Sequence, residues 1–166
     1  MSIELIRRLL LFLVLSVVQI LFLNHIRLFG IATPLLYIFF VITFNRNTPK
    51  WSILLWSFAL GLAIDVFSNT PGLAAGSMTL IAIIQPYLLE LFLPRDSAEN
   101  IQITAATLGL GKYITFCSIL TVIYCLVFFV LEAFSFYDWL HWLICAVSSA
   151  LLTLILIMSI GTVRKK

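Results

Sequence analysis

The chain has 166 residues, of which 63% are hydrophobic and only 10% are charged, and its mean hydropathy is +1.16. A soluble domain is about half apolar and about a quarter charged, so this chain could not cover a folded core with polar surface in water, and we expect it to fold in lipid. The net charge of +3 comes from short Lys and Arg clusters between apolar runs, which argues against a nucleic-acid-binding surface.

The apolar runs predict a single polytopic membrane domain over residues 1–166. A spanning helix needs about 20 mostly apolar residues. The first run is not followed by the small residues of a signal-peptide cleavage site, so we expect it to be retained. The predicted fold is all-α, with six transmembrane helices at 5–23, 28–44, 51–67, 72–93, 105–132 and 139–160.

The positive charges predict the orientation of these helices. If the six predicted helices cross in turn, one side of the membrane carries nine of the ten Lys and Arg residues, and the other side carries Arg27 alone. Cytoplasmic loops are enriched in Lys and Arg. We therefore expect a multi-pass protein of the bacterial inner (cytoplasmic) membrane with both termini in the cytoplasm.

Asp65 is the most informative single residue, because it lies within an apolar span near its predicted outer end. A charge at the centre of a span costs roughly 3 kcal/mol on insertion scales and less near an interface. One interpretation is a contact with a partner or ligand, or a proton site. The other is a helix-end acid that hydrogen-bonds the polar turn at 68–70. The sequence leaves both open.

Two pairs of small residues have the spacing that allows helices to approach closely. Gly72 and Gly76 open the fourth predicted helix, and Gly61 lies on the helix before it. Small residues four apart favour close helix packing in membranes. We expect this pair to pack the third and fourth helices together, and we interpret Ala146 and Ala150 in the sixth helix in the same way.

The sequence does not suggest catalysis. It has no glycine-rich phosphate loop, no Ser/His/Asp set on one helix face and no spacing typical of a metal site. We therefore expect no enzymatic activity, no catalytic residues, no bound metal and no cofactor. The three cysteines lie inside apolar runs and are expected to act as small buried hydrophobic residues.

One block resembles a known family. It runs Gly61-Leu-Ala-Ile-Asp65-Val-Phe-Ser-Asn69-Thr-Pro71-Gly72-Leu. Together with Pro34 near the start of the second predicted helix, it resembles the rod-shape-determining protein MreD family. The resemblance implies a fold similar to the substrate-binding subunits of energy-coupling-factor vitamin transporters.

The same resemblance implies a function. Members of the family are non-enzymatic scaffolds of the elongasome, the complex that synthesises side-wall peptidoglycan and maintains rod shape. The implied partner is the single-span protein MreC, and through it the elongation transpeptidase, its glycosyltransferase partner and MreB. Membrane lipids are the other expected partner, and nucleic acid is not. The candidate residues for contact with MreC, or within the bundle, are Pro34, Asp65, Asn69, Pro71, Gly72 and Gly76.

The alternative function is a small-molecule-binding subunit of a vitamin-type transporter, which the chain length and span count also fit. Two features count against it. Such subunits dock through an Ala-x-x-x-Ala surface on the first helix, whereas the run from Leu9 to Leu23 is rich in Leu and Val. The predicted outer turns are also too short to close over a ligand.

Overall fold

The computed structural model describes residues 2–23, 33–93, 103–133 and 139–163. Every regular element within these ranges is helical. The elements are α1 (Ser2–Val18), a π-helical turn η1 (Gln19–Leu23), α2 (Ile38–Ile42), α3 (Lys50–Ser68), α4 (Leu73–Phe92), α5 (Ala105–Leu108), α6 (Leu110–Ala133) and α7 (Trp139–Val163).

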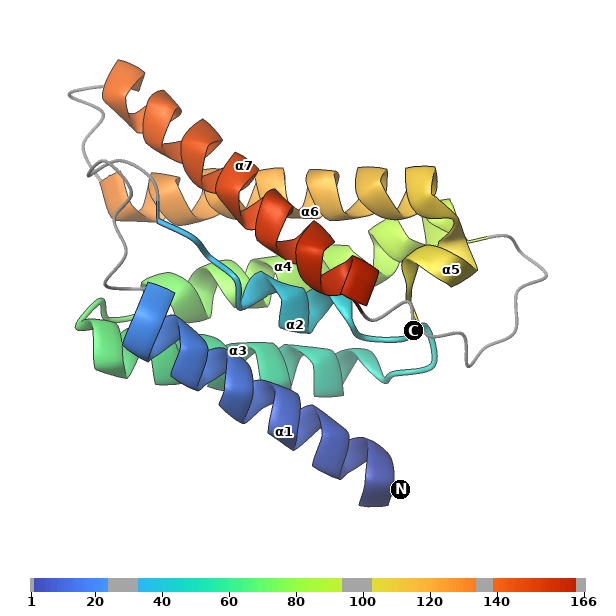
Figure 1. The fold of residues 1–166 in the computed structure, drawn as a ribbon. Helices are drawn as coiled ribbons and strands as arrows, with labels where there is room; N and C mark the ends of the chain where they lie inside the picture. The colour runs from blue at the N-terminus through green and yellow to red at the C-terminus, as the bar shows by residue number, and fades with distance from the viewer. Residues whose placement is uncertain (1, 24–32, 94–102, 134–138, 164–166) are drawn as a thin grey trace.

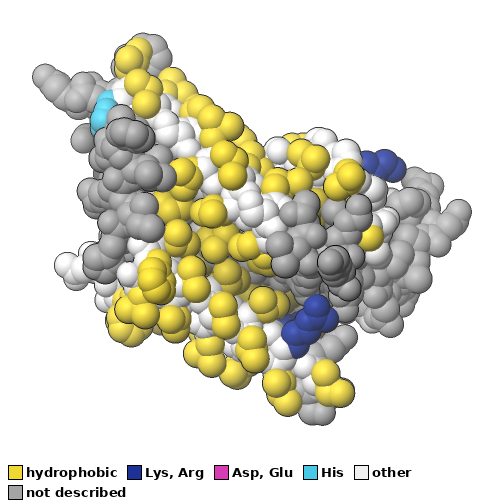
Figure 2. All heavy atoms as spheres, viewed as in Figure 1, with side chains coloured by type: hydrophobic (Ala, Val, Ile, Leu, Met, Phe, Trp, Pro, Cys, Tyr) yellow, Lys and Arg dark blue, Asp and Glu magenta, His cyan; other side chains and the backbone are white. Residues whose placement is uncertain are grey.

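Five of these helices are long and apolar enough to cross a membrane, which confirms the prediction of an all-helical, multi-pass membrane protein. They are Leu5–Leu23, Lys50–Ser68, Leu73–Phe92, Leu110–Glu132 and Leu140–Gly161. Many large apolar side chains on them point outward, and Figure 2 shows these side chains covering most of the described face in view. In water such a surface would drive aggregation, whereas in a bilayer it is the expected contact with lipid.

The start of α1 and the end of α7 lie toward the same end of the bundle (Figure 1). Two contacts agree with this placement. Arg8 donates a hydrogen bond to the Thr48 hydroxyl just before α3, at 3.1 Å. A Cβ atom on Gly161, near the end of α7, would lie 3.0 Å from the Tyr113 hydroxyl at the start of α6. Arg27, Arg95 and residues 164–166 lie outside the described residues.

The second predicted helix, over 28–44, is wrong for the part of it that the structure describes. Residues 33–35 are not helical, and α2 is only five residues long. Every residue of α2 is buried. The helix contacts α1, α3, α4 and α6, and Figure 1 shows it enclosed by the longer helices. The described part of this apolar run, residues 33–44, therefore lies at the centre of the bundle as a broken segment.

Side chains from distant helices satisfy the backbone of this broken segment. Gln19 donates from Nε2 to the Pro34 carbonyl at 2.9 Å and accepts from the Leu36 N–H at 3.1 Å. From α7, the hydroxyl oxygens of Ser149 and Thr153 accept from the backbone N–H groups of residues 33 and 35, each at 3.1 Å. Non-helical backbone at membrane depth is tolerated only where such partners replace the helical hydrogen bonds.

Replacing Gln19 by Leu is expected to destabilise the bundle by about 2–6 kcal/mol. The change leaves one buried carbonyl and one buried N–H without a partner, and each such group costs about 1–3 kcal/mol. Unfolding of the purified protein by SDS in mixed micelles measures the effect. Ser16→Ala is the matched control, because Ser16 is also buried in α1 but its hydroxyl has no partner among the described residues. Equal stability of the two variants would show that Gln19 does not support the broken segment.

The fifth predicted helix, over 105–132, is interrupted near its start. The short helix α5 ends at Leu108, and α6 begins at Leu110. Between them Gly109 has φ +84°, a conformation that glycine adopts without steric cost. The polar stretch at 94–102 lies outside the described residues.

Candidate functional site: the corner between α3 and α4

A tight turn joins α3 to α4 and contains three of the predicted site residues. Asn69 ends α3 with φ 56°, in the left-handed region that Asn tolerates better than most residues. Gly72 precedes α4 with φ +83°, where a side chain would be strained. Pro71 lies between them, and all three are exposed. The turn reverses the chain, so that α4 runs back along α3 (Figure 1).

The carboxylate of Asp65 binds the first turn of α4. Its Oδ1 accepts from the Ala74 N–H at 2.8 Å and from the Thr70 hydroxyl at 3.1 Å, and its Oδ2 accepts from the Ala75 N–H at 2.9 Å. These N–H groups have no partner within their own helix, and the positive end of the helix dipole favours an anion there. Asp65 is only 4% exposed.

The helix-end interpretation of Asp65 is therefore the one that the structure contains. Its polar-turn partner is the Thr70 side chain, and the shorter contacts go to the backbone of α4. Both carboxylate oxygens are already engaged within the chain. Asp65 thus works as a cap that one helix supplies to the next.

The close approach between α3 and α4 occurs at Gly61. A Cβ atom there would lie 2.5 Å from the Ala75 Cα and 2.7 Å from the Ala74 carbonyl oxygen. Real side chains do not come this near to backbone, so only glycine fits. Gly61 lies one helical turn before Asp65, and both residues contact the same two residues of α4.

The prediction that Gly72 and Gly76 form the close-packing pair is wrong. A Cβ atom on Gly72 would meet no atom of the described chain within 4 Å. Glycine is therefore needed at this position for the positive φ of the turn and not for close packing. A Cβ atom on Gly76 would lie 3.7 Å from Leu131 Cδ1 of α6, an ordinary contact. Gly76 therefore faces α6, and the close contact with α4 belongs to Gly61.

Pro34 lies in a different part of the fold, on the broken segment, where its carbonyl accepts the hydrogen bond from Gln19. The residues whose side chains bond this segment were not identified from the sequence. A signal was present, because Ser149 and Thr153 are polar residues four apart in a predominantly apolar helix, and such residues usually face the bundle interior.

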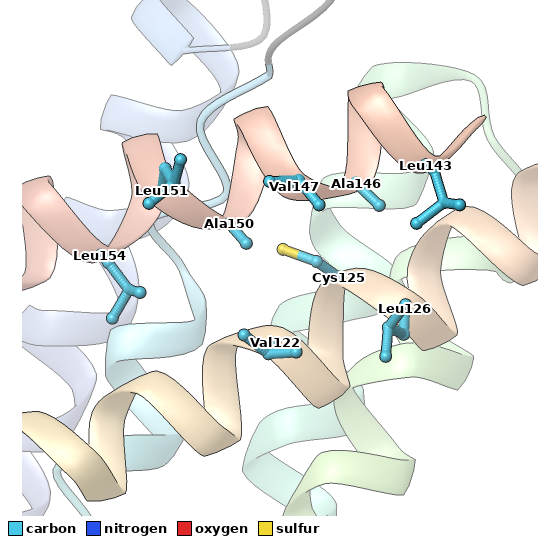
Figure 3. Close-up of a pocket in the computed structure, with 9 residues that line it drawn as sticks. All are labelled: Val122, Cys125, Leu126, Leu143, Ala146, Val147, Ala150, Leu151 and Leu154. Carbon is cyan, nitrogen blue, oxygen red and sulfur yellow. The ribbon is translucent and has the colours of Figure 1, made fainter. Parts of the chain in front are cut away.

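The second small pair, Ala146 and Ala150, is buried against α6. Together with Cys125 these residues line an apolar cavity of about 160 Å³ between α6 and α7. Figure 3 shows the two alanines and Cys125 facing one another across this space. The pair therefore leaves a gap between the two helices at this level.

Within the described ranges, no three His, Cys, Asp or Glu residues lie close enough together to hold a metal ion. Comparison with known proteins adds no relative: no family model matches the chain, and neither a curated protein nor a solved structure matches it.

Proposed function

We propose that this chain is a non-enzymatic scaffold subunit of the bacterial elongasome, as its resemblance to the MreD family implies. Its work is to hold the membrane span of MreC, and through MreC to reach the elongation transpeptidase, its glycosyltransferase partner and MreB. In this proposal the protein lies in the inner membrane, and it has the helix arrangement of the vitamin-transporter subunits to which the family is likened.

The proposed orientation has six crossings and both termini in the cytoplasm. Five long helices alone would put the chain termini at opposite ends of the bundle, yet the start of α1 and the end of α7 lie toward the same end. The broken segment around α2 supplies the sixth crossing. Arg8, Arg46 and Lys50 lie at or beside the loop before α3, at the end of the bundle assigned to the cytoplasm.

The observation that carries the proposal is a narrow exposed stripe on α3. Its large apolar side chains, spaced by four, three, four and four residues, are Trp51, Leu55, Phe58, Leu62 and Val66. Spacing that alternates between four and three is typical of a seam between packed helices. Beside the stripe, α3 is fixed against α4 by Gly61 and Asp65, so the stripe is presented on a rigid support.

α1 offers a useful contrast. It exposes large apolar residues over a broad half of its surface, among them Leu9, Leu10, Leu13 and Val14, which is the pattern of a helix that faces lipid on one side. In this proposal the single-span partner lies on α3, and α1 faces lipid.

Replacing both Phe58 and Leu62 by Ala is expected to reduce co-purification of MreC severalfold and to round the cells. The change removes buried area from the proposed interface but leaves the bundle core intact, because both side chains are about half exposed. The matched control replaces Leu10 and Leu13 of α1 by Ala, which is expected to leave recovery of MreC unchanged.

Two results would contradict the proposal. One is normal MreC recovery and normal rods with the α3 variant. The other is a vitamin-sized ligand that stays bound to the purified protein in native mass spectrometry, which would favour the transport subunit.

A further inference from the structure

A partly polar cavity lies at the proposed cytoplasmic end of the bundle, away from the α3–α4 corner. It has a volume of about 240 Å³ and lies between the loop before α3 and the last turns of α4. Thr48, Gln85 and Leu89 are buried lining residues, whereas Arg46, Lys50 and Glu90 line it and are exposed. The cavity thus has a buried side and a charged rim.

Gln85 is the unusual member of this cavity. It is 1% exposed, and its Nε2 donates to the Phe44 carbonyl at 3.1 Å, which fixes the amide. Its Oε1 is buried and accepts no hydrogen bond from any described residue. A buried amide oxygen without a donor costs about 1–3 kcal/mol, so a ligand hydroxyl or N–H group that donates to it would be stabilised.

The rim favours an anion. Arg46 and Lys50 oppose the single acid Glu90 among the described residues that line the cavity. Lys50 is held there, because its Nζ lies 4.3 Å from the centre of the Tyr87 ring. Arg8 adds a third cation beside the loop, through its hydrogen bond to Thr48.

The depth of the cavity points to the head-group layer of the membrane. Lys50 begins one spanning helix and Phe92 ends another, so the cavity lies where two spans leave the hydrocarbon. Trp51 and Tyr87 are exposed here, and these residue types are enriched at membrane interfaces.

We propose that this cavity binds the head group of an anionic phospholipid that carries free hydroxyl groups, of the phosphatidylglycerol type. The phosphodiester pairs with Arg46 and Lys50 at the rim. A glycerol hydroxyl donates to the free Oε1 of Gln85, and Glu90 offers a second acceptor. The bound lipid would fix the loop before α3 and so the start of the helix that carries the proposed MreC stripe.

Lipid binding to the purified full-length protein tests the inference by native mass spectrometry. Three lipids with the same acyl chains are compared: phosphatidylglycerol, phosphatidylethanol and phosphatidylcholine. Phosphatidylethanol keeps the anionic phosphodiester but lacks the head-group hydroxyls, so it isolates the contribution of Gln85. We expect phosphatidylglycerol to be retained best and phosphatidylcholine least. The hydroxyl requirement is tested on the lipid because the Gln85 amide also holds Phe44.

The charge requirement is tested on the protein. Arg46→Gln and Lys50→Gln together are expected to lower phosphatidylglycerol binding by roughly fivefold for each cation removed. Lys112→Gln is the matched control, because Lys112 is an exposed cation that does not line the cavity, and it should bind like the unchanged protein.

Three outcomes would overturn the inference. The first is undiminished phosphatidylglycerol binding by the double variant. The second is equal binding of phosphatidylglycerol and phosphatidylethanol, which would show that the head-group hydroxyls do not contribute to binding. The third is displacement of the lipid by soluble glycerol 3-phosphate, which would show that the ligand is a free polyol phosphate. None of these outcomes concerns MreC, so this test can fail while the proposed scaffold function stands.

Discussion

Asp65→Ala is expected to lower the free energy of unfolding by about 2–6 kcal/mol. The change leaves the Ala74 and Ala75 N–H groups, both buried, without an acceptor, and each costs about 1–3 kcal/mol. It also removes the anion from the positive end of α4. SDS unfolding in mixed micelles measures the loss. Asp65→Asn should lose less, because its remaining amide oxygen still accepts one of the two bonds.

The control for this prediction is Glu90→Ala, which removes an exposed acid from the opposite end of α4 and is expected to change stability by less than about 0.5 kcal/mol. Thr70→Val gives an intermediate test, since it removes only the hydroxyl contact at 3.1 Å. If Asp65→Ala were as stable as the unchanged protein, the carboxylate would not be the cap that joins the two helices.

Gly61→Ala is expected to destabilise the bundle by about 1–3 kcal/mol, although alanine is the better helix former. The added methyl group would lie 2.5 Å from the Ala75 Cα and 2.7 Å from the Ala74 carbonyl oxygen. Both atoms are backbone, so neither can turn aside, and α3 and α4 must separate. That separation also stretches the hydrogen bonds to Asp65. The same unfolding measurement tests it.

Gly76→Ala is the matched control, because it makes the same chemical change near the start of the next spanning helix. Its methyl group would meet only the Leu131 side chain, at 3.7 Å. The expected effect has the opposite sign, a gain of up to about 1 kcal/mol from helix propensity. Equal effects at the two glycines would mean that α3 and α4 do not approach closely at Gly61.

Hydropathy located the long spans well, because burial in lipid is the property that it measures. The prediction of 51–67 compares with Lys50–Ser68 in the structure, and that of 72–93 with Leu73–Phe92. The same property misread residues 33–44, the described part of the second predicted helix. An apolar run looks alike whether it is a spanning helix or a buried broken segment.

The difference depends on partners that lie far away in the chain. The side chain of Thr153 bonds the backbone of Leu35 across 118 residues, and no local pattern reports such a pair. The candidate site likewise has one part that the sequence predicts and one part that depends on distant partners. The cost of a charge in a span identified Asp65 as important, but its partners are backbone N–H groups of the next helix, and those depend on how the turn at 69–72 folds.

The central claim, that the stripe on α3 receives the MreC span, is tested most directly by disulfide crosslinking in intact cells. A single cysteine replaces Leu62 in a chain without its native cysteines, and single cysteines are scanned along the MreC span. The expected result is crosslinks that recur every three to four residues of MreC. A cysteine in place of Leu10 on α1 should form none. Crosslinks from Leu10→Cys with none from Leu62→Cys, or no crosslink to MreC from either, would contradict the claim.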